Sequence, residues 1–292
     1  YDSATSGKAY LGYTAIGDFY YSLPPFNSWT FCLDAAWAAG KAVTTATVNG
    51  VTYIYSANAG CYKFDFGSHI LVPVTLSGTV AANVIGIVGV LGYLVCWTKD
   101  AVAWSSLLDP TDFVPSLSTG AGGGSVQGAR GDIITCVSHT AGFVVYTNQN
   151  AVAAAGSNNS RYPFNFREIV GSGGLASQNL ATIDANAGNH FVYTSAGLQA
   201  ISLQEARTVI PELTDFLAGA VFEDFDPATN TFTITRLSEV LKKRLVLISE
   251  RYLVISYGIT ELTHALVFDT VLRRWSKLKA TYIAVLEFSL LD

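Results

Sequence analysis

The sequence predicts an all-β protein, and three observations carry that prediction. Hydrophobic residues make up 50% of the 292 residues, and they fall in short runs rich in β-branched and aromatic side chains. The runs pair across brief polar turns that contain Asn, Gly or Asp, as antiparallel hairpins do. The turns of the first four hairpins recur roughly every 40 to 50 residues, the period of a four-stranded propeller blade. We therefore expect a β-propeller-like array of four-stranded antiparallel sheets.

Six hairpins underlie this expectation. Their strand pairs are Val51–Ser56 with Cys61–Phe66, Gly92–Trp97 with Ala101–Trp104, Gly142–Tyr146 with Ala151–Ala155, His190–Tyr193 with Leu198–Ile201, Arg244–Ile248 with Tyr252–Ser256, and Ala265–Phe268 with Arg274–Trp275. A β-sandwich would also supply short strands, but its turns should fall every ~8–12 residues without the longer grouping. We expect Trp97, Trp104 and Trp275 to belong to the structural core between packed sheets.

The order of segments predicts four parts. Residues 1–49 form an irregular and partly stranded segment, a subunit-contact arm or part of a platform, and residues 50–201 form propeller blades. Residues 202–220 form a small helical insertion, because Ser202 to Leu217 spaces its apolar residues as a helix does, with Pro211 dividing it. Residues 221–292 form the final propeller or platform strands. Residues 79–97 carry no charge, but their glycines and β-branched residues predict two buried strands rather than a membrane span. Residues 118–131 are rich in glycine, and we expect a flexible surface loop there.

The composition points to contacts with other molecules. Charged residues are only 13% of the chain, against about 25% in a typical soluble domain, so we expect surplus apolar surface to lie between subunits. The net charge of −5 argues against a basic nucleic-acid-binding surface, but it does not exclude a channel through which DNA slides without sticking. No methionine occurs, so we expect a processed N-terminus or a portion of a longer chain. The first twelve residues lack the pattern of a secretory signal.

The segment Ala101–Ser116 is the most informative local feature. A strand ending in Trp104 runs into a turn built on Asp109-Pro110 and Asp112. Pro110 restricts its own φ, and both aspartates can accept hydrogen bonds from nearby backbone N–H groups, so the corner should be stiff. We expect such a corner to present a surface to neighbours. The predicted contact residues are Asp109, Asp112 and Phe113, together with Tyr20, Tyr21, Phe26 and Trp29 of the proline-rich N-terminal segment.

Motifs for chemistry are weak. The cysteines, Cys32, Cys61, Cys96 and Cys136, form no CxxC pair and read as buried reduced thiols, although a disulfide stays open. The histidines, His69, His139, His190 and His264, form no HxH or HExxH pattern. Glu223, Asp224 and Asp226 read as a solvated turn rather than a calcium or glycosidase site. We interpret Arg130-Gly131-Asp132 as an ordinary turn rather than a cell-adhesion motif, and Asn158-Asn-Ser160 as a polar loop rather than a glycosylation site. We therefore predict no enzyme activity, cofactor or metal.

Three segments together resemble a known family. Val102–Ser116, Tyr162–Ile169 and the strand, Asp turn and Trp-bearing strand of Val267–Trp275 resemble the propeller region of tail nozzle and head-to-tail stabilisation proteins of short-tailed bacteriophages. The resemblance covers roughly Gly50 to Lys279, and many family members are much longer.

The resemblance implies a structural virion protein of the tail, assembled in the cytoplasm of a bacterial host. Such proteins form a homo-oligomeric ring, usually a hexamer, below the portal and adaptor and next to tail fibre proteins, and double-stranded DNA passes non-specifically through the lumen during retention and ejection. The alternative is a carbohydrate-binding or glycan-hydrolysing propeller, which predicts acidic and aromatic residues converging at one end of the channel. An outer-membrane barrel would need longer, evenly spaced strands.

Overall fold

A computed structural model describes residues 2–3, 7–8, 10–13, 18–23, 25, 27–33, 43–78, 83–159, 161–184, 188–210, 221–226, 228–236, 242–248, 251–258 and 262–282. These residues form antiparallel sheets and one short 3-10 helix, η1 (Gln178–Leu180). The chain divides into two compact units, one of residues 1–128, 140–143 and 154–166, and one of residues 129–139, 144–153 and 167–292.

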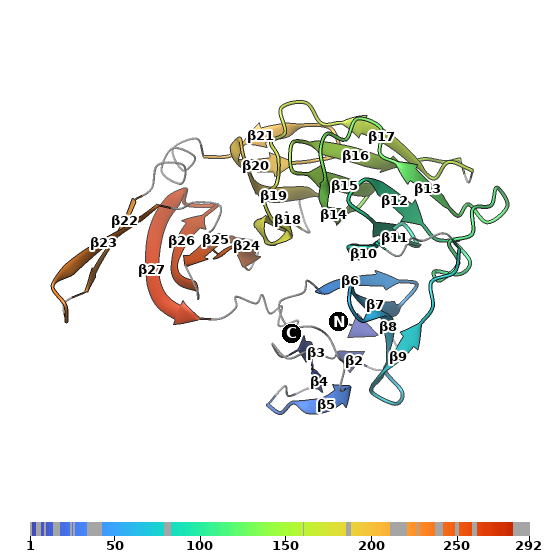
Figure 1. Ribbon diagram of the computed structural model, residues 1–292, viewed down its shortest axis with the longest axis horizontal. Helices are drawn as coiled ribbons and strands as arrows, with labels where there is room; N and C mark the ends of the chain where they lie inside the picture. The colour runs from blue at the N-terminus through green and yellow to red at the C-terminus, as the bar shows by residue number, and fades with distance from the viewer. Residues whose placement is uncertain are drawn as a thin grey trace. The chain divides into compact units, whose positions relative to one another are not determined.

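Five four-stranded sheets dominate the described residues, and in each the strands follow one another in sequence order (Figure 1). They are β6 (Val43–Val48), β7 (Val51–Ser56), β8 (Gly60–Asp65) and β9 (Ile70–Val74); β10 (Gly86–Val90), β11 (Tyr93–Trp97), β12 (Ala101–Trp104) and β13 (Gly122–Ser125); β14 (Ile133–His139), β15 (Gly142–Thr147), β16 (Ala151–Gly156) and β17 (Phe164–Glu168); β18 (Ala181–Asp184), β19 (Asn189–Thr194), β20 (Gly197–Ile201) and β21 (Ala206–Thr208); and β24 (Lys242–Ile248), β25 (Tyr252–Gly258), β26 (Leu262–Asp269) and β27 (Arg274–Tyr282). All six predicted hairpins are confirmed.

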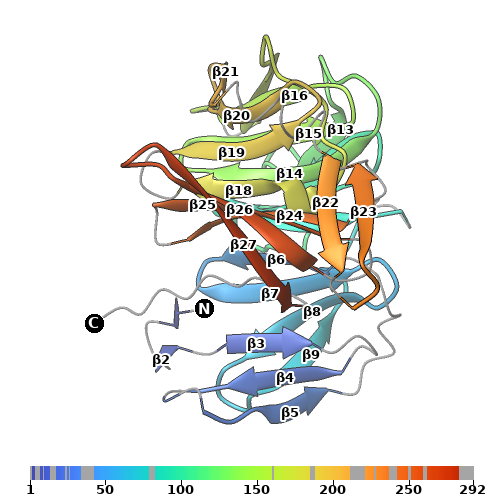
Figure 2. The ribbon, with the colours of Figure 1, turned by 90° about the vertical axis from the view of Figure 1, so that its left-hand side faces the viewer.

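Three smaller sheets complete the described structure. They are β1 (Asp2–Ser3) with β2 (Gly7–Lys8); β3 (Tyr10–Tyr13), β4 (Phe19–Ser22) and β5 (Thr30–Leu33); and β22 (Val221–Asp226) with β23 (Thr231–Arg236). Within the first unit, β5 contacts β9, and Figure 2 shows the three-stranded sheet next to β6–β9.

The sheets stack face to face, which explains where the apolar residues go. In the first unit the leading strands β6 and β10 contact each other, and in the second unit β18 contacts β24. The second strands β11 and β15 are buried along their whole length, because a middle strand of a stacked sheet is covered on both faces. Part of the apolar surplus that we assigned to subunit contacts is therefore used between sheets.

A threonine turn recurs between the second and third strands of three sheets. Thr98, Thr147 and Thr194 each follow a large aromatic residue, and each hydroxyl accepts a backbone N–H two or three residues later. This is the hydroxyl form of the side-chain-capped turn. The first hairpin turn of two sheets, Asn49-Gly50 and Leu91-Gly92, places two consecutive residues at positive φ, as a tight type I′ hairpin requires.

Two local predictions were wrong. The helix expected over residues 202–220 is absent from its described part: Ser202 to Glu205 is a turn capped by the Ser202 hydroxyl, and Ala206–Thr208 is strand β21, whose pairing with β20 outweighs the helical spacing. Residues 211–220 lie outside the described residues. The glycine-rich loop expected over 118–131 contains strand β13, because Gly122, Gly123 and Gly124 pair with β12.

The predicted blade region, residues 50–201, differs at both ends, and at its far end the sheet β18–β21 continues to Thr208. The first four-stranded sheet begins at Val43 rather than at residue 50. The acidic group at 223, 224 and 226 lies in strand β22 and not in a turn. Within the described residues, no helix has the length and apolarity needed to cross a bilayer.

Candidate interaction surface

Buried serines anchor the corner that follows β12. Ser105 and Ser106 are almost completely buried, and the Ser105 hydroxyl accepts the N–H of Leu94 at 3.0 Å. The Ser106 hydroxyl accepts the N–H of Leu108 at 3.1 Å. Because buried hydroxyls are costly unless bonded, the Ser105 bond holds the base of the corner against β11, and the Ser106 bond closes the first turn of the corner on itself.

The two aspartates stiffen the corner as predicted. Asp109 Oδ1 accepts the backbone N–H and the hydroxyl of Thr111, both at 2.8 Å. Asp112 Oδ1 accepts the N–H of Val114 at 3.0 Å and the hydroxyl of Ser77 at 3.1 Å. Ser77 also forms a parallel β-bridge with Asp112. The corner is therefore tied both to itself and to the segment after β9.

Phe113 faces inward, which corrects its prediction as a contact residue. It is 2% exposed and packs in a cluster with Leu94, Cys96 and residues of β6 and β7. The backbone at Gly78 crosses so close to Phe113 that a Cβ there would lie 2.7 Å from the Phe113 carbonyl carbon. Phe113 fastens the corner to the core, so any contact with a neighbour must come from the residues around it.

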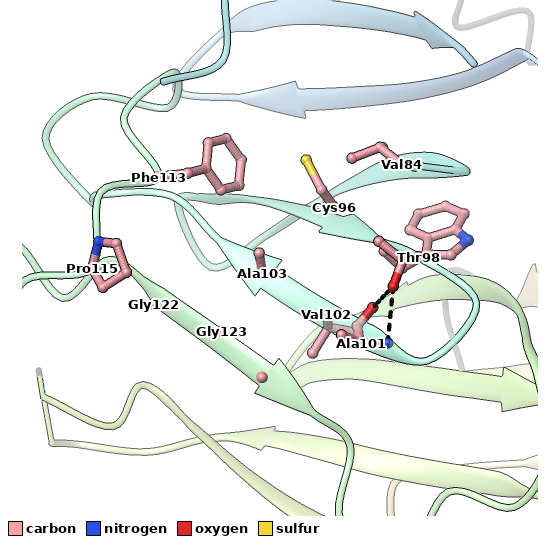
Figure 3. A pocket seen from close by; sticks show the side chains of 12 residues that line it. Val84, Cys96, Thr98, Ala101, Val102, Ala103, Phe113, Pro115, Gly122 and Gly123 are labelled. Atoms are coloured by element: carbon pink, nitrogen blue, oxygen red, sulfur yellow. Dashed lines mark hydrogen bonds between the residues drawn. The ribbon is translucent and has the colours of Figure 1, made fainter. Parts of the chain in front are cut away.

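A cavity of about 240 Å³ lies beneath the corner (Figure 3). Phe113, Val84 and Cys96 approach it from one side of the sheet, and Ala103 and Gly123 form its floor. The Thr98 hydroxyl, near one end, is already engaged by Asp100 and the backbone of Ala101. The walls are mainly apolar, so the cavity offers room for a small apolar group and no arrangement for acid–base chemistry.

Four large apolar side chains project outward around the corner. Leu108 is 88% exposed and Leu117 63% exposed, and Leu107 and Val114 are also exposed. Asp109 is exposed beside them. We call Leu107, Leu108, Asp109, Val114 and Leu117 the corner patch. Adjacent exposed apolar residues on a rigid frame are typical of a protein–protein contact.

Trp104 connects two segments that are distant in sequence, Val102–Ser116 and Tyr162–Ile169. Its indole Nε1 donates to the Gly120 carbonyl at 2.8 Å, and its ring packs edge-on against Phe164 at 5.6 Å and tilted against Phe166 at 6.3 Å. Trp104 is half-buried, whereas Trp97 is 1% exposed. Both lie in the packing between sheets. The glycines of β13 make room, since a Cβ on Gly122 would lie 3.3 Å from the Trp104 ring.

Trp275 is not a core residue. It lies on β27, the last strand of its sheet, and is 38% exposed, with its ring packed against Phe268 at 4.9 Å. A strand at the end of a four-stranded sheet has no neighbour on one side, so its side chains are covered incompletely.

The predicted N-terminal contact residues separate into two faces of the sheet β3–β5. Tyr20 stacks edge-on against Phe31 at 5.7 Å, and Trp29 lies over Gly12. Trp29 is 54% and Phe31 52% exposed, so this aromatic row is accessible. Tyr21 faces the other way, partly buried, stacked on His69 at 4.9 Å and packed against the core, and its role as a subunit contact stays a prediction. Phe26 lies outside the described residues.

The cysteines and the pair Arg130–Glu168 form no reactive cluster among the described residues. All four cysteines are free thiols, and burial raises the pKa of Cys61 to about 12. Arg130 pairs with Glu168 at 2.8 Å. In the part of the chain that the structure describes, no three His, Cys, Asp or Glu side chains gather closely enough to hold a metal ion.

Sequence reasoning missed a buried pair in the second unit. His190 Nδ1 lies 2.8 Å from the Tyr146 hydroxyl, and His190 Nε2 lies 2.7 Å from the Ser138 carbonyl oxygen. Burial is the main cause that lowers the pKa of His190 to about 4. The only sign of this pair in the sequence was a polar side chain within each of two otherwise apolar strands, Tyr146 in β15 and His190 in β19.

Comparison with known proteins establishes the fold. No protein-family model and no curated protein sequence matches the chain. The solved structure of YCF48 bound to D1 peptide covers 96% of this chain and 83% of its own, with a TM-score of 0.54 and 10% identity. Dihydro-heme d1 dehydrogenase NirN in complex with DHE covers 96% of this chain with a TM-score of 0.52 and 9% identity. This chain spans 55% of the NirN chain. Both are β-propellers, and this chain is a β-propeller.

Proposed function

We propose that this chain is a structural subunit of a virion tail, similar to the tail nozzle proteins of short-tailed bacteriophages. In that role copies of the chain form a ring below the portal and adaptor, contact tail fibre proteins, and conduct double-stranded DNA. The proposal places the protein in the virion after assembly in the host cytoplasm. It assigns no catalytic activity to the chain.

The corner patch is the observation that carries the proposal. Its leucines lie on a corner whose turns are capped by aspartates and whose base is anchored by buried serines. The backbone that carries them is therefore already ordered in the free chain. A contact that needs little ordering on binding loses little conformational entropy. Such a surface suits repeated contact between subunits better than chemistry on a small substrate.

The resembling segments give separate support. Phe164 and Phe166 of the second segment pack on Trp104 of the first, so two segments that are distant in sequence form one packed feature. In the third segment, Asp269 caps the turn that leads to Trp275. The similarity to solved propellers concerns the fold alone, so the choice of function depends on these residues.

The mass of the purified full chain, measured over a range of concentrations, tests the proposal. A closed ring of defined copy number, seen by native mass spectrometry and by electron microscopy, is the expected result. A single chain that stays monomeric at about 100 μM, well above the affinity range of stable assemblies, would overturn it.

A carbohydrate-binding propeller is the second candidate, and one observation favours it. The exposed rings of Trp29 and Phe31, next to the half-buried Tyr20, offer flat apolar surfaces with a polar edge, on which a sugar ring can stack. A glycan array would test it with Trp29→Ala as the matched variant. Binding by the native chain that Trp29→Ala abolishes would favour this candidate, and no binding by either would reject it.

A further inference from the structure

Positive charge is concentrated in the last four-stranded sheet. Residues 242–282, which hold β24–β27, contain eight of the 17 Lys and Arg residues but only three of the 22 Asp and Glu residues. This segment therefore carries an excess of five positive charges, which leaves −10 for the rest of the chain. The overall charge of −5 conceals this asymmetry.

The turn and outer strand of that sheet combine the positive charge with exposed apolar side chains. At the turn, Val271 is 70% and Leu272 57% exposed. Arg273 and Arg274 follow and are exposed, as are Trp275 and Leu278 on the strand. We call Val271, Leu272, Arg273, Arg274, Trp275 and Leu278 the β27 edge.

The turn is held rigidly by Asp269. Its Oδ1 accepts the N–H groups of Val271 and Leu272, each at 2.9 Å. Its Oδ2 accepts the Arg251 guanidinium at 2.6 Å. The hydrogen bond from Arg251 is the main cause that lowers the pKa of Asp269 to about 2. The negative charge of Asp269 is thus paired with the positive charge of Arg251. The charges that the turn exposes to solvent are those of Arg273 and Arg274.

The corner patch has the same construction with the opposite charge. Both surfaces stand on aspartate-capped turns and expose two adjacent aliphatic side chains, Leu107-Leu108 in one and Val271-Leu272 in the other. Asp109 is exposed in the corner patch, and no Lys or Arg occurs between Lys99 and Arg130. The two surfaces therefore complement each other in charge and match in apolar content.

We infer that the corner patch of one copy docks on the β27 edge of the next copy. The inference rests on the proposed ring and names the contact that builds it. A contact between two different surfaces is head-to-tail, and it generates a closed ring when the rotation between copies closes. Apolar contact at the centre contributes affinity, and the opposite charges guide the orientation of the two copies.

A second copy fits the β27 edge better than nucleic acid does. A phosphate backbone would match Arg273 and Arg274 but would leave Val271 and Leu272 against water or polar sugar and phosphate groups. Surfaces that bind nucleic acid rely mainly on cations, with little exposed aliphatic area. A second copy covers both kinds of side chain at once.

Charge exchange at two exposed positions tests the inference on the full chain. The Leu108 side chain is 88% exposed and holds no turn or core contact in place, so Leu108→Lys should leave folding intact. It places a cation opposite Arg273 and Arg274, and we expect the concentration for half-assembly to rise at least about tenfold. Arg274→Glu should have a similar effect. The double variant, Leu108→Lys with Arg274→Glu, should recover assembly because the charges again oppose.

Two variants serve as controls. Val170 is 84% exposed and lies outside both surfaces, so Val170→Lys should assemble like the native chain. Leu108→Glu removes the same apolar side chain but keeps the favourable sign, so it should assemble better than Leu108→Lys. Sedimentation equilibrium gives the assembly midpoint, and thermal melts of the same samples show whether each variant is folded.

The outcomes separate the inference from the proposed function. Rings that form normally with Leu108→Lys and Arg274→Glu would overturn the docking contact and leave the ring itself intact. Equal loss with Leu108→Glu and Leu108→Lys would overturn the charge complementarity. If Arg274→Glu left the ring unchanged but abolished binding of a labelled DNA duplex, the β27 edge would face nucleic acid instead. A native chain that never assembles would defeat the proposed function as well.

Discussion

Replacing His190 with glutamine should flatten the pH dependence of stability between about pH 6.5 and pH 4. His190 is fully buried on β19. Its Nε2 faces the carbonyl oxygen of Ser138, which can only accept, so Nε2 carries the proton. Nδ1 then accepts from the Tyr146 hydroxyl. Both ring nitrogens are satisfied in the neutral form, and a second proton on Nδ1 would break the bond from Tyr146.

The sign and size of the effect follow from the pKa of His190. It is about 4 in the folded chain, mainly because of burial, against about 6.5 in an unfolded chain. Above pH 6.5 both states hold a neutral ring and stability is fully present. As the pH falls from 6.5 to 4 the unfolded state takes up a proton that the folded state resists, so stability is lost. A difference of about 2.5 pKa units corresponds to about 3 kcal/mol.

This window lies above the range in which Asp269 titrates, and comparing the two chains cancels the contribution of groups that both contain. The pKa of Asp269 lies near 2 in the folded chain, so the stability that it contributes is lost only below about pH 4. Glutamine can still donate to Ser138 and accept from Tyr146, so His190→Gln should fold, with a cost of about 1–2 kcal/mol at pH 7.

Urea unfolding of both chains at half-unit steps from pH 7.5 to pH 4 provides the assay. The destabilisation caused by His190→Gln should shrink as the pH falls and should vanish or reverse by pH 4. An NMR titration of the His190 ring in the native chain should show no midpoint above pH 5. Parallel stability curves for the two proteins, or a ring midpoint near 6.5, would refute the reasoning.

Three further predictions concern packing. Phe113→Ala should destabilise the chain by about 3–5 kcal/mol, whereas Leu108→Ala should change stability by less than about 0.5 kcal/mol; equal effects in urea unfolding would show that Phe113 is not a core residue. Gly123→Ala should destabilise by roughly 1–3 kcal/mol, because its Cβ would lie 2.6 Å from the Val102 carbonyl oxygen, and Gly124→Ala should be nearly neutral, because nothing lies within 4 Å; a thermal melt that ranks them in reverse would contradict strand β13. Trp104→Ala should cost about 2–4 kcal/mol, less than a fully buried Trp would, because the ring is half-buried, and an unchanged melt would reject its place between sheets.

The strands were predictable because the residues of each hairpin, within a short stretch of sequence, are enough to indicate two paired strands and a turn. β-Branched and aromatic runs separated by short polar turns allow little besides antiparallel pairing. One stronger repeat signal was overlooked: Thr98, Thr147 and Thr194 each follow Trp or Tyr. Because each hydroxyl caps the same turn in its sheet, this aromatic–threonine pair could have marked the blades from the sequence.

Which side chains are exposed could not be predicted in the same way. Phe113 and Trp275 are both large aromatics beside an Asp turn, yet Phe113 is 2% and Trp275 38% exposed. The difference arises because the corner folds back over the neighbouring sheet, whereas β27 is the last strand of its own. The glycines of β13 likewise read as a flexible loop until a paired strand, β12, lies beside them.

Local patterns in this chain therefore determined the class of fold, its hairpins and the stiffness of its aspartate turns, because those properties depend on neighbours within a few residues. Burial of Phe113, the neutral tautomer of His190 and the two outward surfaces of opposite charge were decided only by the tertiary structure. Each of these depends on segments tens of residues apart that meet when sheets stack, and no single segment contains that information.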